Sequence, residues 1–261
     1  MTPQADTLLD NPFPGFRAYE EHENNFLLGR SGAVDELLAK LRITKFLAVV
    51  GGPCTGKSSL VTGGLLPALK KGLGAQAGTK WRVATMRPEV SPIHNLALAL
   101  AQQGVIKSNS VEPDYAQNIE TDLRESSNGI AHALQNAGFP ENEHLLIVVD
   151  QFEDIFRLSK NSLMGTSDKS DITTFVNLLI VASRQRDYPI SIAMTMRTLY
   201  LGNCSNFRGL PEAINQGQYL IPTLKQADFR QMMLSLADLG DIEIEANALN
   251  IINTILNECD S

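Results

Sequence analysis

Short runs of consecutive apolar residues recur along the chain, separated by stretches in which apolar residues are spaced three or four positions apart. The first pattern is typical of strands buried on both faces, and the second of amphipathic helices. The apolar runs predict strands at residues 46–50, 81–86, 145–149, 189–196 and 218–221. The helical spacing predicts helices at residues 34–41, 57–70, 92–103, 130–137 and 175–182. This alternation predicts an α/β fold with a mostly parallel sheet covered on both faces.

Other stretches do not follow this alternation. Residues 106–122 are polar and fit neither pattern, and residues 158–170 (LSKNSLMGTSDKS) are expected to form an exposed loop. From residue 223 onward the apolar spacing is only helical, so we expect the start of a separate helical region. The predicted organisation is an extended N-terminal segment at residues 1–25, an α/β core at 26–222 and an incomplete helical lid at 223–261.

Charge and composition narrow the class of partner. Of the 261 residues, 22 are Lys or Arg and 29 are Asp or Glu, which gives a formal net charge of −7. We therefore expect no broad positive face for nucleic acid or anionic lipid. The cysteines at positions 54, 204 and 259 lack the spacing of a disulfide framework or a zinc site. No secretory signal and no apolar run of roughly 20 residues is present, so a cytoplasmic protein without a membrane span is expected.

The most specific motif is GGPCTGKS at residues 51–58, which fits the phosphate-loop pattern G-x-x-x-x-G-K-[ST]. It follows a predicted buried strand and precedes a predicted helix, as the motif requires. Glycines let backbone N–H groups converge on phosphates, and the helix N-terminus adds a positive dipole. Lys57 is expected to reach the β- and γ-phosphates. The nucleotide-binding residues predicted in this stretch are Gly51, Gly52, Pro53, Cys54, Thr55, Gly56, Lys57, Ser58 and Ser59.

A carboxylate at the tip of the third predicted strand is the second signal. Asp150 directly follows the apolar run LLIVV, and a charge there is costly unless it meets a cation or hydrogen-bond donors. We expect Asp150 and the Ser58 hydroxyl to hold Mg²⁺, directly or through water. Cys54, inside the phosphate loop, has two interpretations: a thiolate favoured by the local positive field, or a small side chain that fills space, which we prefer.

Hydrolysis also needs a group that orients water in line with the γ-phosphate. We favour Glu153 as this base, with Asp154 and Gln151 as competitors and a solvated charge at a helix start as the alternative. Arg197 ends the fourth predicted strand, at the edge where parallel sheets bind ligands. It is a candidate to bind the γ-phosphate and stabilise the transition state. The alternative is an arginine that simply points from the end of the sheet into solvent, which the sequence does not distinguish.

These residues resemble the NTPase domain of STAND-class P-loop ATPases, specifically the novel STAND NTPase branch related to NACHT domains. The resemblance covers nearly the whole chain. It rests on NPFPG at 11–15, FLLGR at 26–30, the strand and Walker A motif at 45–60, the Walker B segment DQFED at 150–154, the sensor-1 segment TMR at 195–197 and the passage into a helical lid at 210–222.

The resemblance implies a three-layer P-loop sheet of the additional-strand type, in which one strand separates the Walker A and Walker B strands. It also implies that Gly29 and Arg30 lie near the adenine. No N-K-x-D sequence favours guanine, so adenine is the expected base.

The expected function is an ATP/ADP switch that hydrolyses ATP slowly with Mg²⁺ and forms a homo-oligomer or binds a partner protein in its ATP state, as in signalling or defence proteins of this class. The alternative is a nucleotide-binding interaction module without significant hydrolysis. A small-molecule kinase ranks lower, because no acceptor-pocket signature is present.

Overall fold

The computed structural model describes residues 17–27, 30–72, 80–102, 104–106, 114–160, 166–222 and 232–235. Its centre is a five-stranded sheet in the order β2-β3-β4-β1-β5, and every neighbouring pair is parallel. The strands are β1 (Phe46–Gly51), β2 (Lys80–Met86), β3 (Glu143–Val149), β4 (Ile190–Arg197) and β5 (Gln218–Leu220). Strand β4 lies between β1 and β3, which confirms the additional-strand arrangement.

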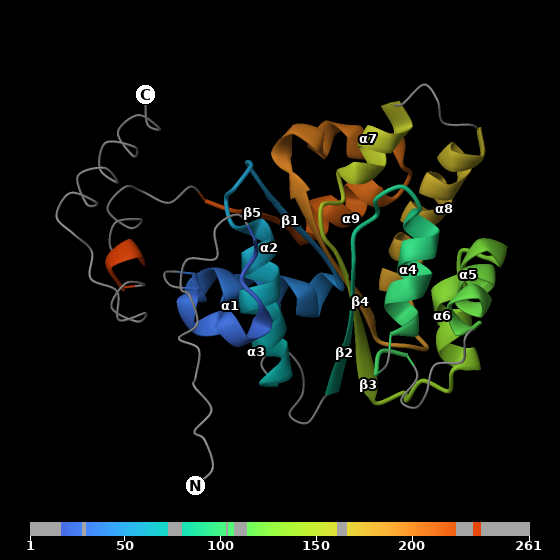
Figure 1. The fold of residues 1–261 in the computed structure, drawn as a ribbon, viewed down its shortest axis with the longest axis horizontal. Coiled ribbons are helices and arrows are strands. Elements are labelled where there is room, and N and C mark those ends of the chain that lie inside the picture. The colour runs from blue at the N-terminus through green and yellow to red at the C-terminus, as the bar shows by residue number, and fades with distance from the viewer. Residues whose placement is uncertain are drawn as a thin grey trace, which may run out of the picture.

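Helices cover both faces of the sheet (Figure 1). One side carries α1 (Ser31–Thr44), α2 (Lys57–Ser59), the π-helix η2 (Leu60–Leu65) and α3 (Leu66–Lys70). The other carries α4 (Pro92–Ala101), α5 (Tyr115–Glu125), α6 (Gly129–Asn136), α7 (Asp154–Lys160), α8 (Thr166–Ser183) and α9 (Leu210–Gly217). Two 3-10 helices, η1 (Glu21–Phe26) and η3 (Thr198–Asn206), complete the described elements.

Strand β1 shows why the apolar runs are continuous. Phe46, Ala48 and Val50 point into one hydrophobic core, whereas Leu47 and Val49 point into the other. Every residue of the strand is buried. A central parallel strand has no solvated face, so its sequence does not alternate between apolar and polar residues.

The helix predicted over residues 57–70 is present, but its middle turns, Leu60–Leu65, are a π-helix. A Cβ on Gly64 would lie 2.8 Å from side-chain atoms of both Leu27 and Val34, so this stretch of helix packs closely against its neighbours. Helical spacing in the sequence does not distinguish such an insertion from a regular helix, because both leave an apolar stripe.

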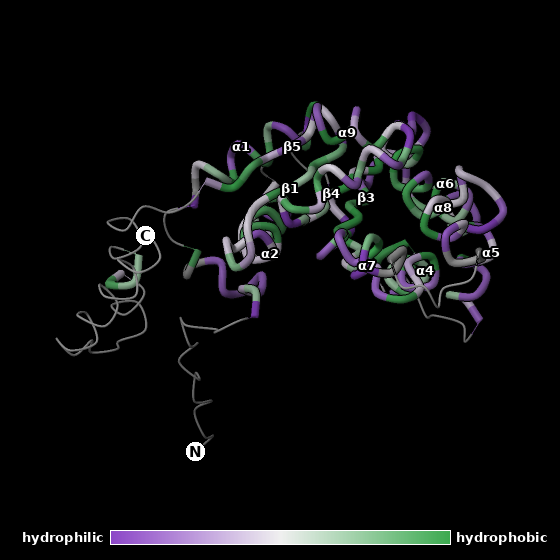
Figure 2. Tube along the Cα trace, turned by 90° about the horizontal axis from the view of Figure 1, so that it is seen from above, coloured by the Kyte–Doolittle hydropathy of each residue, from purple (hydrophilic) through white to green (hydrophobic). Residues whose placement is uncertain are grey.

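Two predictions about polar segments were wrong or incomplete. Residues 115–125, which overlap the end of the stretch that fitted neither pattern, form α5, which buries only Ile119 and Leu123. Figure 2 shows α5 at the outer edge of the molecule with long hydrophilic stretches. The expected exposed loop at 158–170 is instead helical at both ends, in α7 and α8, and residues 161–165 lie outside the described residues.

The terminal regions are described only in part. Residues Glu21–Phe26 of the N-terminal segment predicted to be extended form η1, and residues 1–16 lie outside the described residues. Most of the predicted helical lid, 223–261, lies outside them too, so the three-part division stays a prediction. Within the described ranges, no helix combines the length and the apolar character needed to cross a bilayer.

Candidate functional site

Strand register assembles the polar residues at the carboxyl edge of the sheet. Gly51, the last residue of β1, pairs with Arg197, the last residue of β4. Val149 pairs with Met194 and Met86 pairs with Val149, so the residues that follow them, Asp150, Thr195 and Arg87, come together. The edge at which parallel sheets bind ligands thus carries residues from four parts of the chain.

The phosphate loop runs from the end of β1 to Lys57, the first residue of α2. Gly56 has a φ of 82°, a left-handed conformation that glycine adopts without strain. A Cβ on Gly51 would lie 2.7 Å from Thr55 Oγ1, so the turn leaves no room for a side chain there. The glycines at both ends of the motif therefore serve the turn itself.

Cys54 does not fill space as preferred from the sequence. Its side chain is exposed, and its φ of 55° places it at a left-handed turn position. It lines a cavity together with residues 53 and 55–59. The other described cysteine, Cys204, is buried, and burial raises the pKa of its thiol to about 12.

Lys57 faces the cavity from the start of α2. Its ammonium group donates a hydrogen bond to the carbonyl oxygen of Gly52, within the loop. Burial lowers the pKa of Lys57, and the Glu153 carboxylate opposes that shift. An ammonium group that is partly removed from water is stabilised by a negatively charged ligand, which favours its charged form.

Asp150 is the most densely hydrogen-bonded side chain of the site. Its Oδ1 accepts hydrogen bonds from Ser58 Oγ at 2.6 Å and from Thr195 Oγ1 at 2.7 Å. Its Oδ2 faces the guanidinium of Arg87, with Nη2 at 3.1 Å. Thr195 also accepts a hydrogen bond from the Gln151 N–H at 3.0 Å and so fixes the turn after β3.

The Ser58 and Asp150 oxygens fit the chemistry of Mg²⁺, a hard cation that is commonly bound by one or two protein oxygens together with phosphates and water. They already lie within hydrogen-bond distance of each other. In the described part of the chain, no group of three or more His, Cys, Asp or Glu side chains could hold a metal on its own. A metal at this site would therefore depend on the ligand for its other oxygens.

Glu153 and Arg197 form an ion pair at the same edge. Arg197 Nε lies 3.2 Å from Glu153 Oε1, and the backbone N–H of Arg197 donates to Glu153 Oε2 at 3.3 Å. Only 4% of Glu153 is exposed. Of its two competitors, Asp154 pairs with Arg157 at 3.5 Å, whereas Gln151 borders the cavity.

One cavity of about 520 Å³ lies among these groups, and Asp150 stands outside its lining. It is lined by Arg17, Ala18, Pro53, Cys54, Thr55, Gly56, Lys57, Ser58, Ser59, Arg87, Gln151, Glu153, Thr195 and Arg197. The predicted loop residues from Pro53 onward, the predicted base and the predicted arginine therefore face one space. Gly51 and Gly52 lie behind it as the root of the turn.

Of the predicted Gly-Arg pair, the structure describes only Arg30, which lies away from the cavity. Gly29 is outside the described residues. Arg30 precedes α1, and its Nη1 lies 3.3 Å from the carbonyl oxygen of Pro222, just after β5. Burial lowers the pKa of Arg30. Because Arg30 does not line the phosphate-loop cavity, a role near the adenine stays a prediction.

Two cavity arginines were missed from the sequence. Arg87 directly follows β2, so the strand-end rule that singled out Asp150 and Arg197 would also have found it. Arg17 precedes η1 and does not follow a strand that the sequence predicts, so only its position in space connects it to the site.

Comparison with known proteins gives one family. The family model of novel STAND NTPase 1 (nSTAND1) matches residues 12–261. None of the curated proteins compared with the chain is a match.

Among solved structures, the Aeropyrum pernix ORC2 protein in its ADPNP–ADP complexes is 15% identical, with a TM-score of 0.54, over 88% of this chain and 56% of that one. A chain of the E. coli MS115-1 HORMA:CdnC:Trip13 complex is 14% identical, with a TM-score of 0.51, over 91% of this chain and 78% of that one. This chain thus spans little more than half of the ORC2 chain. At such identities the likeness shows a shared fold alone.

Proposed function

The chain belongs to the novel STAND NTPase 1 family, and from this premise we propose that it is an ATP-binding switch that hydrolyses ATP slowly with Mg²⁺. One observation carries the proposal: Ser58 Oγ lies 2.6 Å from Asp150 Oδ1 at the mouth of the phosphate loop. Lys57 borders the same cavity as Ser58. This is the arrangement that a phosphate-bound Mg²⁺ requires of a P-loop protein.

Binding of the triphosphate is assigned to the loop and to Lys57. Backbone N–H groups of residues 54–58 and the N-terminus of α2 supply fixed partial positive charge, and Lys57 supplies a mobile positive charge. The ammonium group donates one hydrogen bond to the Gly52 carbonyl oxygen and has two further N–H donors for a phosphate. Mg²⁺, held by Ser58 and Asp150, supplies charge neutralisation for the phosphate oxygens when bound.

The switch is assigned to Arg197 and Arg87, because each is paired with a carboxylate that borders or supports the cavity. A γ-phosphate offers Arg197 a second anion and competes with Glu153 for it. ADP lacks that phosphate, so the two nucleotides bias the Glu153–Arg197 pair differently. A ligand shifts a conformational equilibrium only through such differential contacts.

Hydrolysis is assigned to Glu153 as the group that polarises the attacking water. With Arg197 Nε 3.2 Å from its Oε1, this carboxylate is engaged in an ion pair and is free to orient a water only when the arginine moves. Slow turnover follows from this pairing. The same pairing favours a second candidate function, a nucleotide-binding interaction module without significant hydrolysis.

Affinity for ATP and ADP, each measured by calorimetry with and without Mg²⁺, tests nucleotide binding. We expect Lys57→Ala to abolish binding. Phosphate release then separates the two functions: Glu153→Gln should keep nucleotide affinity and slow turnover by about a hundredfold or more. Asp154→Asn is the matched control, because Asp154 does not line the cavity. Turnover unchanged in Glu153→Gln rejects its assignment, and no release by the wild type establishes the binding module.

The wider role is proposed from the family and from composition. We assign the chain to a signalling or defence protein in the cytoplasm, where the ATP state favours a homo-oligomer or a partner protein. A net charge of −7 argues against nucleic acid as that partner. Light scattering of the protein with ADP and with a non-hydrolysable ATP analogue tests this, and equal mass in both states argues against ATP-dependent oligomerisation.

A further inference from the structure

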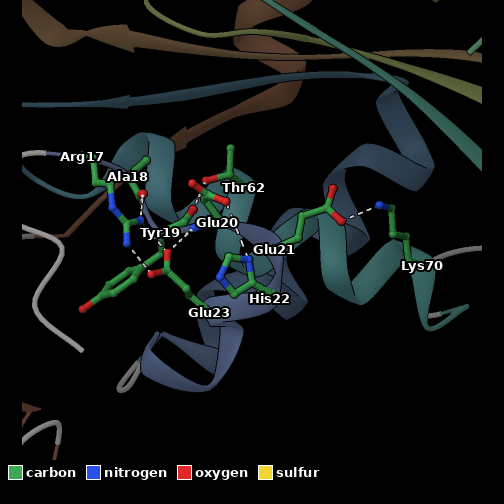
Figure 3. Close-up of polar contacts among 9 residues, drawn as sticks. All are labelled: Arg17, Ala18, Tyr19, Glu20, Glu21, His22, Glu23, Thr62 and Lys70. Carbon is green, nitrogen blue, oxygen red and sulfur yellow. Dashed lines mark hydrogen bonds and ion pairs between the residues drawn. The ribbon is translucent and has the colours of Figure 1, made fainter. Parts of the chain in front are cut away.

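The N-terminal segment, residues 17–27, lies against the helix that follows the phosphate loop (Figure 3). The Tyr19 N–H donates a hydrogen bond to Ser59 Oγ at 3.2 Å, and Thr62 Oγ1 donates to the Tyr19 carbonyl oxygen at 2.5 Å. A Cβ on Gly63 would lie 3.0 Å from the Tyr19 Cβ. The helix therefore has a residue without a side chain where the segment crosses it. These contacts fix the segment next to Ser58 and Ser59.

This docking brings Arg17 to the phosphate cavity, which it lines together with Lys57, Arg87 and Arg197. Its side chain is 47% exposed, so solvent or a ligand can reach it. The four cations come from four separate parts of the chain. Glu153, the partner of Arg197, lines the cavity, whereas Asp150, the partner of Arg87, does not. Arg17 also has a carboxylate partner outside the cavity lining.

That partner is Glu23, whose side chain is only 3% exposed. Both of its oxygens accept hydrogen bonds from Arg17, with Nη1 at 2.6 Å. The backbone N–H of Glu20 also donates to Glu23 Oε2, at 2.7 Å, as part of a capping box at the start of η1. Hydrogen bonds from Arg17 lower the pKa of Glu23 to about 2, so this carboxylate stays charged at neutral pH.

Arg17 has hydrogen-bond donors that its contacts with Ala18 and Glu23 do not use. A guanidinium has five N–H groups, and those directed at Ala18 and Glu23 account for three hydrogen bonds. A planar fork held on one side by a carboxylate presents its other side in a fixed direction, which is how arginine binds phosphate oxygens with geometric specificity.

We propose that Arg17 is a further phosphate-binding residue of the nucleotide site and that Glu23 is its positioning residue. The proposal rests on the proposed nucleotide-binding function. It also specifies which phosphates are contacted. Ser58 points to Asp150, whereas Ser59 points to Tyr19 of the N-terminal segment, so Arg17 approaches from the side of the loop away from Asp150. Arg17 therefore binds the α- and β-phosphates, which ATP and ADP share.

Titration of the full chain with ATP and with ADP tests this contact. Arg17→Gln should weaken both affinities by about tenfold to a hundredfold, the worth of a charge-assisted hydrogen bond. Arg17→Lys should recover part of the loss, because it keeps the charge without the fork. Arg186→Gln, an exposed arginine outside the cavity lining, is the matched control for net charge. Unchanged affinity in Arg17→Gln, or loss confined to ATP, overturns the proposal.

Glu23→Gln distinguishes positioning from a general charge effect. If Glu23 acted only through its charge, removing a negative group near the phosphates would strengthen nucleotide binding. If it positions Arg17, the same change weakens ATP and ADP binding alike by about three- to tenfold. Circular dichroism confirms that each variant is folded. Stronger binding, or no change, in a folded Glu23→Gln overturns the positioning role.

These results separate the inference from the proposed function. If the wild type binds nucleotide, Lys57→Ala does not, and Arg17→Gln binds like the wild type, only the role of Arg17 is wrong. If the wild type binds neither ATP nor ADP, the proposed function itself is wrong.

Discussion

Replacing Thr195 by valine tests the hydrogen-bonded junction that assembles the site. The Thr195 side chain is 1% exposed and joins the turn after β3 to the end of β4. Its hydroxyl donates to Asp150 Oδ1 at 2.7 Å and accepts from the Gln151 N–H at 3.0 Å. Gln151 has a φ of 58°, a strained conformation for a residue other than glycine, so it depends on its neighbours to hold it.

The expected cost is set by these two bonds. Valine has nearly the same volume as threonine, so no cavity is created. A hydrogen bond to a charged group contributes about 1.5–3 kcal/mol, and a buried N–H left without a partner costs about 1–3 kcal/mol. Because Gln151 is half-buried, we take the lower end of the second range and expect Thr195→Val to lower the free energy of unfolding by about 3 kcal/mol.

Urea denaturation followed by circular dichroism measures this change, with Thr195→Ser as the control. Serine keeps both hydrogen bonds and loses one methyl group, which costs about 1 kcal/mol. The valine variant should also bind Mg²⁺·ATP more weakly than the serine variant, because Asp150 has lost a fixed donor. If valine and serine destabilise equally, the hydroxyl does not hold the junction together.

Three further results are expected for stability. Arg82→Met should cost about 3 kcal/mol in urea denaturation, since it leaves the Glu143 carboxylate without its buried guanidinium partner. Gly217→Ala should prevent normal folding, as judged by circular dichroism, because its Cβ would lie 1.7 Å from the Phe46 carbonyl oxygen. With the pKa of Glu23 lowered from 4.5 to about 2, its stabilising contribution is complete above pH 4.5 and is lost as the pH falls toward 2, so Glu23→Gln should flatten acid denaturation there.

The parts of the fold predicted from sequence are those that local rules determine. Strand β3 is a continuous apolar run because it is buried on both faces, and the phosphate loop has a fixed spacing because its turn needs glycine at set positions. In contrast, α5 escaped prediction because only two of its residues, Ile119 and Leu123, are buried. A helix with so narrow an apolar stripe resembles a polar loop in sequence.

Outside the phosphate loop, the site was predicted by one rule, that ligand-binding residues stand at the ends of strands, and Arg87 was missed although it follows β2. Asp150 and Arg197 satisfy that rule. Arg17 does not, because tertiary contacts through Tyr19 bring it to the cavity from a segment in which the sequence predicts no strand. The ion pair between Glu153 and Arg197 could not be predicted from the sequence either, because it depends on which two strands are neighbours in the sheet.

Alkylation of Cys54 tests most directly whether nucleotide occupies the phosphate loop. This thiol is exposed at the cavity, whereas Cys204 is buried with its pKa raised to about 12, so mass spectrometry of the two provides a reporter and an internal control. Mg²⁺·ATP and ADP should each slow labelling of Cys54 by about tenfold or more in the wild type and leave it unchanged in Lys57→Ala. Labelling of Cys54 at the same rate with saturating nucleotide as without it would contradict the account.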